Sequence, residues 1–204
     1  MSITVKDQLS MNRLIVAITL IATSGFQGFS QGIGSFEFMN VGVPADRLIY
    51  VDQYLVPGQE ASGSGYKIAV YYGPAGTTDE HALILGGAPT VFLDPPGGGQ
   101  FNGGARTLTG LTEDGAVVAI QARAWDVSTG ATWEEAAANP NGRVGKGPVF
   151  EMALKDPTQP LDPLPRLGYA AGWQGFAITP VPEPSVWGLA GVGIATLLFF
   201  RRRH

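Results

Sequence analysis

The side chains that could do acid–base chemistry in this chain are a few carboxylates and one internal histidine. Asp126 follows an apolar segment, and Glu134 and Glu135 come soon after it. Two carboxyl groups held at a fixed separation are what glycoside hydrolysis requires, so Asp126 with Glu134 or Glu135 is a candidate catalytic pair. Carboxylates on a loop after a strand are more often solvated, and the run from 126 to 130 favours an Asx turn over a calcium loop.

Other kinds of reactive site find little support. The chain has no cysteine and only two histidines, His81 and His204, which excludes thiolate chemistry and a histidine-rich zinc site. No serine lies in a nucleophile motif, and Asp79-Glu80-His81 is typical of a solvated loop. The Gly-rich runs at 103–104 and 142–147 lack the spacing of a nucleotide loop, so we expect a surface loop and a turn there. We therefore expect no metal, no cofactor and no enzymatic activity.

Aromatic side chains could instead bind a sugar by stacking on its ring. Trp125 is the best candidate because it falls on the same strand face as Gln121 and Arg123, which are expected to point away from the core. Aromatic residues at alternating strand positions are more often core residues. A carbohydrate-binding role is therefore the alternative to a purely structural one. The other aromatic residues of such a platform would be Tyr71, Trp133 and Trp173.

Composition and charge limit the classes of function. The chain has 204 residues, of which 29 are glycine and 15 are proline, a content that favours turns and short strands over long helices. Between residues 31 and 180 lie fifteen of the 17 acidic residues but only eight of the 13 basic residues. This central part is acidic and repels phosphate backbones, so we expect no nucleic-acid partner.

The N-terminus has the pattern of a secretory signal peptide. Lys6 and Arg13 precede an apolar run at 14–22, and small residues follow it. At ~1.5 Å per residue this run is too short to span a bilayer core of about 30 Å. We therefore assign residues 1–30 to a signal peptide, with Met11 as an alternative start.

The C-terminus has three parts in a set order. Pro182, Glu183 and Pro184 come first, and the 15 residues from 186 to 200 then carry no charge. As a transmembrane helix this segment would be about 22 Å long, somewhat shorter than the usual hydrocarbon thickness. A basic cluster follows and should stay on the cytoplasmic side of the membrane, which places the preceding residues outside the cytoplasm. The cluster consists of Arg201, Arg202 and Arg203.

This tail, residues 181–204, resembles the PEP-CTERM sorting signal of bacteria. The resemblance implies that Pro182, Glu183 and Pro184 are recognised by an exosortase, a membrane cysteine protease. The protein would pass through an inner-membrane intermediate, held by the span at 186–200, to the cell surface or the extracellular space. Proteins with this signal are typical of Gram-negative bacteria that secrete exopolysaccharide, which is a candidate partner. An ordinary tail anchor is the alternative.

Residues 31–180 are expected to form an all-β ectodomain. Apolar residues alternate with others at 66–72, 118–124 and 149–155, the period-two pattern of an antiparallel sheet with one face on a core and one in solvent. Short strands separated by Gly and Pro turns favour an antiparallel β-sandwich or jelly roll. Further strands are expected at 35–41, 47–52, 90–93, 106–109 and 174–179, and one short helix at 133–138.

The sequence thus predicts an exported bacterial cell-surface or matrix protein with a structural or interaction role. About 150 residues can bury a core adequate for independent folding, so the absence of disulfides is no obstacle. The specific activity of the ectodomain is left open by the residues present.

Overall fold

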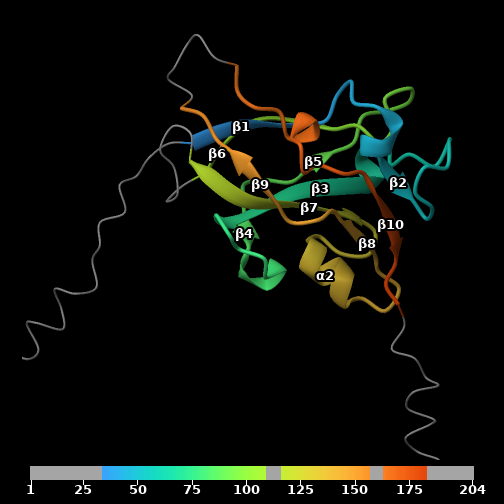
Figure 1. Cartoon of the computed structure of the whole chain (residues 1–204). Helices are drawn as coiled ribbons and strands as arrows, with labels where there is room; N and C mark the ends of the chain where they lie inside the picture. Colours follow the sequence, from blue (N-terminus) through green and yellow to red (C-terminus); the bar gives the residue numbers. More distant parts are fainter. Residues whose placement is uncertain (1–33, 109–115, 157–162, 183–204) are drawn as a thin grey trace, which may run out of the picture. The chain divides into compact units, whose positions relative to one another are not determined.

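The computed structural model describes residues 34–108, 116–156 and 163–182. These residues are mostly β-structure with one short helix (Figure 1). The predicted signal peptide, the apolar run at 186–200 and the terminal arginines lie outside the described residues. The strands are β1 (Gly34–Met39), β2 (Ile49–Val51), β3 (Tyr66–Pro74), β4 (Ile84–Leu85), β5 (Thr90–Val91), β6 (Asn102–Leu108), β7 (Val117–Asp126), β8 (Arg143–Lys146), β9 (Phe150–Ala153) and β10 (Phe176–Pro180).

The helical elements are short. The α-helix is α2 (Trp133–Ala138), which coincides with the predicted helix, and the 3-10 helices are η1 (Ala45–Arg47), η2 (Gly63–Gly65), η3 (Glu80–Ala82) and η4 (Leu167–Tyr169). The Thr132 hydroxyl caps α2 by accepting a hydrogen bond from the N–H of Glu135.

The larger sheet has the strand order β2-β10-β8-β7-β3-β4, with β5 also paired to β3 and β9 to β7, while β1 and β6 form a second sheet. Among the described strands every pair is antiparallel except β10 with β2, where Phe176 lies opposite Ile49 in a parallel register. The sheet is therefore mixed, and the expectation of a purely antiparallel arrangement is wrong at this pair. Parallel neighbours need a long crossover, and here most of the body intervenes between β2 and β10.

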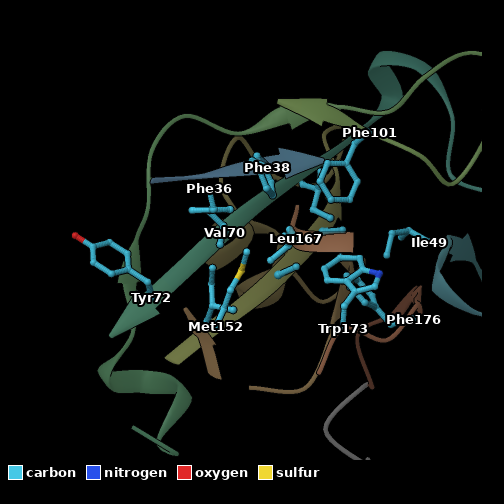
Figure 2. Packing of buried hydrophobic residues seen from close by; sticks show 14 of the residues in the cluster. Phe36, Phe38, Ile49, Val70, Tyr72, Phe101, Met152, Leu167, Trp173 and Phe176 are labelled. Atoms are coloured by element: carbon cyan, nitrogen blue, oxygen red, sulfur yellow. The ribbon is translucent and has the colours of Figure 1, made fainter. Parts of the chain in front are cut away.

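The even-numbered residues of β3 and β7 face the main hydrophobic core, as the alternation predicts. Ile68, Val118 and Ile120 have no exposed surface, because the phenylalanines of β1 and the segment leading into β10 pack against them. The rings of Phe38 and Phe101 lie 4.9 Å apart between their centroids. Figure 2 shows how Phe36, Phe38, Val70, Phe101, Met152, Leu167, Trp173 and Phe176 gather in this core.

The odd-numbered face of the same two strands is also covered, and the expectation that it is solvated is wrong. A second hydrophobic cluster forms there, with Trp133 and Val144 packed at its edge. Helix α2 contacts β7 and β8 on this side. The second cluster consists of Ala69, Tyr71, Leu83, Ala119, Trp125 and Ala136.

Two glycine-rich runs expected to be a loop and a turn are strands instead. Strand β6 begins at Asn102 and includes Gly103, where a Cβ atom would come within 2.5 Å of the Phe38 ring. Strand β8 includes Gly145, where a Cβ atom would lie 2.3 Å from the carbonyl oxygen of Ala177 in β10. Glycine serves both positions because it lets a neighbouring ring or backbone approach closely.

Candidate functional site

A buried arginine lies on the odd-numbered face of β7. Arg123 is 6% exposed. Its guanidinium carbon lies 4.0 Å from the ring centroid of Tyr71 and 4.8 Å from that of Trp133. Its Nε donates to Gln121 Oε1 over 2.8 Å, and its Nη2 donates to the Glu80 carbonyl oxygen over 2.6 Å. Ring contacts and hydrogen bonds therefore fix the guanidinium in one orientation.

Two glutamates complete this group of residues. Glu134 Oε1 accepts a hydrogen bond from the Tyr71 hydroxyl over 2.7 Å and lies 3.8 Å from Arg123 Nη1. The Glu80 carboxylate pairs with Lys146 and accepts from Gln121 Nε2 over 3.3 Å. Two cations therefore face two carboxylates, and the group is close to neutral. We call it the Arg123 cluster, and it consists of Tyr71, Glu80, Gln121, Arg123, Trp133, Glu134 and Lys146.

The pKa values of Tyr71 and Glu80 are both shifted away from neutral pH. Burial raises the pKa of the Tyr71 phenol, and its hydrogen bond to Glu134 raises it further, so Tyr71 stays a neutral donor. The hydrogen bond from Lys146 lowers the pKa of Glu80, which outweighs the opposing effect of desolvation. General acid–base catalysis requires a group that gains and loses a proton easily near pH 7, and neither Tyr71 nor Glu80 does so. This arrangement suits a structural clamp that ties η3 and α2 to the sheet.

Replacing Glu80 by glutamine is expected to make folding less sensitive to acid. Because the pKa of Glu80 is lowered in the folded protein, its contribution is present above the ordinary glutamate pKa and is lost as pH falls through the lowered value. The unfolding free energy of the unchanged protein should therefore fall more steeply between about pH 5 and pH 3 than that of Glu80→Gln, by up to about 1 kcal/mol, since the pair is partly exposed. Denaturant titrations at a series of pH values measure this difference.

The control for this prediction is Glu151→Gln. The Glu151 carboxylate accepts a hydrogen bond from the backbone N–H of Gly76. Parallel pH curves for Glu80→Gln and the unchanged protein would contradict the assignment of acid sensitivity to the Glu80–Lys146 pair.

The three carboxylates considered for the candidate catalytic pair, those of Asp126, Glu134 and Glu135, have separate partners. Asp126 Oδ1 accepts from the N–H of Ser128 over 2.9 Å and from its hydroxyl over 2.7 Å, which confirms the predicted Asx turn. Glu135 Oε2 accepts from the N–H of Ala131, just before α2, and Glu134 belongs to the Arg123 cluster. Each of the three therefore has a structural partner, and among the described residues no hydrogen bond or ion pair joins Asp126 to either glutamate.

Trp125 does not offer an open ring to a sugar. It is 1% exposed, and its Nε1 donates to the carbonyl oxygen of Gly130 over 3.1 Å. Its ring packs in the second cluster together with Tyr71, while Trp173 is buried in the main core. The expectation of a stacking platform centred on Trp125 is therefore wrong. The Trp125 ring is buried because α2 and the segment before it cover that face of β7.

Sequence reasoning missed the Arg123 cluster as a unit. Gln121 and Arg123 were expected to point away from the core, and they do so, yet both are buried. The Asp79–His81 segment was expected to be solvated, and only Glu80 of that segment belongs to the cluster. A polar pair inside an otherwise apolar strand was the available signal, since such groups are buried only with partners. Those partners come from distant parts of the chain, so they could not be named in advance.

Two surface hollows lie away from this cluster. One, of about 370 Å³, lies between β9 and η4, and the other, of about 300 Å³, lies beside the segment after β3. Glu151 lines both of them, and Arg166 and Tyr169 line the larger one. Within the described ranges, no group of three or more histidine and acidic side chains is placed to hold a metal ion. None of the helices there has the length and hydropathy needed to cross a bilayer.

The last strand of the sheet ends where the predicted sorting motif begins. Strand β10 lies between β2 and β8 (Figure 1), with Pro180 opposite Arg143. The N–H of Val181 then donates to the carbonyl oxygen of Gly142 over 2.8 Å. Pro180 and Pro182 have no N–H and cannot extend the hydrogen-bonded ladder. Pro182 is the last described residue, and Glu183 and Pro184 lie outside the described ranges.

Comparison with protein families finds a PEP-CTERM protein-sorting motif at residues 180–203. The resemblance of the tail is confirmed, and the motif implies an exported protein that an exosortase processes and sorts to the cell surface. The match covers the C-terminal tail alone and assigns no activity to the β-structured part. No curated protein and no solved structure gave a match to the chain.

Proposed function

Since the chain ends in an exosortase-sorting motif, we propose that it works as a cell-surface or extracellular-matrix protein whose β body has a structural or interaction role. The observation that carries this proposal is the direct junction between β10 and the motif. Strand β10 ends at Pro180, one more backbone hydrogen bond joins Val181 to Gly142, and the motif matches from residue 180 onward. Pro182, Glu183 and Pro184 would then be offered to the protease next to a folded domain.

The two ends of the chain support a common topology. The signal peptide proposed at 1–30 would start export, and Arg201 to Arg203 would hold the last residues on the cytoplasmic side while the run at 186–200 spans the membrane. The body, residues 31–180, would then fold outside the cytoplasm. Its large buried core supports folding there without any disulfide.

A binding or scaffolding role fits the described side chains better than a catalytic one. The carboxylates near α2 are engaged in caps, turns and the Arg123 cluster. Phe36 and Phe38 of the smaller sheet pack in one core with Ile68 and Ile120 of the larger sheet. This packing supports a two-layer, sandwich-like body, an architecture that presents loops and sheet faces to partners. An exopolysaccharide partner has only the resemblance of the tail as support.

Replacing Pro182 and Pro184 by alanine is expected to block maturation. Proline restricts its own φ angle and keeps the preceding residue extended, so the motif would be pre-organised for an extended protease cleft. Alanine removes this restriction and favours helix in the residues before the apolar segment. In a host that carries the exosortase, intact-mass spectrometry should find the unchanged protein without residues beyond Ser185. The variant should accumulate as a full-length, membrane-bound precursor.

A matched control for this experiment exists in the body. Pro163-Leu164-Pro165 is a second Pro-x-Pro segment, so Pro163→Ala with Pro165→Ala makes the same chemical change outside the tail. This control should be processed normally. Normal processing of the Pro182 and Pro184 variant would refute recognition of the motif by its prolines.

A further inference from the structure

The chain between β2 and η2 forms a hairpin with an exposed loop. After β2 the chain turns and returns alongside it, since the N–H of Val51 donates to the Gln59 carbonyl oxygen over 2.6 Å and the N–H of Ala61 donates to that of Ile49 over 2.9 Å. We call residues 52–58 the hairpin loop. Its position is fixed by β2, which is held against β10 by parallel pairing.

The hairpin loop exposes apolar side chains in a strained backbone. Leu55 is 47% exposed and has a φ of +62°, which is rare for a residue with a branched side chain. Tyr54 is 40% exposed, and Pro57 is also exposed. Strain and an exposed leucine both cost stability, and strained residues concentrate at functional sites. An exposed leucine in such a fixed, strained loop is suited to contact with an apolar surface outside the protein.

The hairpin loop lies at the end of the sheet from which the chain leaves toward the tail. Because β2 and β10 run parallel, the residues after both strands lie at the same end. The N–H of Asp52 donates to the Ile178 carbonyl oxygen over 2.9 Å. Asp52 also pairs with Arg143, which lies opposite Pro180. This pairing neutralises the charge of Asp52 beside the exit point.

The length of chain beyond Pro182 limits how far this end can be from a membrane. Val186, the first residue of the apolar run, comes four residues after Pro182. At up to ~3.6 Å per residue, those four residues span about 14 Å at most. Val117, at the other end of β7, lies nine residues from Asp126, or about 30 Å, and Ile84, which is level with Ile120, lies six residues from Asp126, or about 20 Å. With the run at 186–200 inserted, this short connection would bring the end with the hairpin loop to the lipid surface.

We propose that the hairpin loop rests on the headgroup region of the bilayer while the tail holds the precursor in the membrane. This inference depends on the proposed function, because it requires the run at 186–200 to be inserted. Leu55 and Pro57 would enter the interface, while Tyr54 stays packed edge-on against Tyr50 with its hydroxyl on the Asp46 carbonyl oxygen. The contact would orient the body and set the height of Pro182-Glu183-Pro184 above the membrane for the protease.

Single-cysteine labelling tests the proposal, because the natural chain has no cysteine. The full-length precursor carrying Leu55→Cys would be labelled with an environment-sensitive fluorophore and reconstituted in phosphatidylcholine vesicles with lipids that carry a quencher near the headgroup. Ile84→Cys is the matched control, since Ile84 is an aliphatic residue, 59% exposed, of β4 at the opposite edge of the sheet from β2. We expect several-fold stronger quenching and a blue-shifted emission at position 55 compared with position 84.

A third label separates the two ways in which the proposal can fail. Ile194→Cys reports on the apolar run itself, and quenching at this position by lipids labelled deep in the acyl chains shows that the tail is inserted. Quenching at 194 with equal signals at 55 and 84 would overturn the membrane contact of the hairpin loop alone. No quenching at 194 would overturn the membrane-held precursor, and the inference about the hairpin loop would fall with it.

Discussion

Replacing Arg123 by leucine should lower the free energy of unfolding by about 2–3 kcal/mol, because it leaves buried hydrogen-bond acceptors without their donor. The substitution removes the donors to Gln121 Oε1 and to the Glu80 carbonyl oxygen. It also removes the cation 3.8 Å from Glu134, but that side chain is 57% exposed, so the loss of this ion pair adds little. Urea unfolding followed by circular dichroism measures the loss.

The control for this prediction is Lys146→Ala, which removes the other cation of the Arg123 cluster. Lys146 pairs with Glu80, but the two side chains are 42% and 31% exposed, so its removal should cost no more than about 1 kcal/mol. Arg123→Lys provides a second comparison, since it keeps the positive charge but cannot make the same set of hydrogen bonds or lie flat on two rings. If Arg123→Leu and Lys146→Ala had equal effects, the cluster would not be a structural clamp.

Valine at position 145 should break the pairing of β8 with β10. A Cβ atom on Gly145 would lie 2.3 Å from the Ala177 carbonyl oxygen and 3.0 Å from the Phe176 ring. The carbonyl belongs to the backbone of β10 and cannot move without disturbing its pairing with β8 and β2. We expect a loss of stability of at least about 3 kcal/mol, at the upper end for single substitutions. Denaturant unfolding and limited proteolysis near residues 176–182 measure it.

Gly65→Ala is the control for this clash. A Cβ atom on Gly65 would meet nothing within 4 Å, so the substitution tests the loss of a glycine without a steric conflict. Its effect on stability should stay within about 0.5 kcal/mol, as for other surface substitutions. A Gly145→Val protein as stable as Gly65→Ala would show that β10 does not need its close approach to β8. The position at which the chain leaves the sheet after β10 would then not depend on the pairing of β10 with β8.

The strands with regular alternation were predictable from the chain alone, but the environment of their second face was not. Period two identified β3 and β7 and the correct core face of each. The same pattern gave no warning that Tyr71 and Arg123 are covered on the other side. That coverage depends on α2 and η3, and the Glu80–Lys146 pair joins residues 66 positions apart. A residue pattern predicts the local conformation of a strand and which side chains share a face. Pairs of distant residues such as Glu80 and Lys146 depend on the order and register of the strands.

The sorting tail was determined by the sequence itself. Its prolines, apolar run and arginines are contiguous, and such a signal is recognised by their order and chemistry along a short stretch of chain. Only the tertiary structure decided that Gly145 belongs to a strand, that Trp125 is buried, and that β2 runs parallel to β10. Each of these depends on close packing between segments distant in the chain, where a fit of a few tenths of an ångström separates contact from clash.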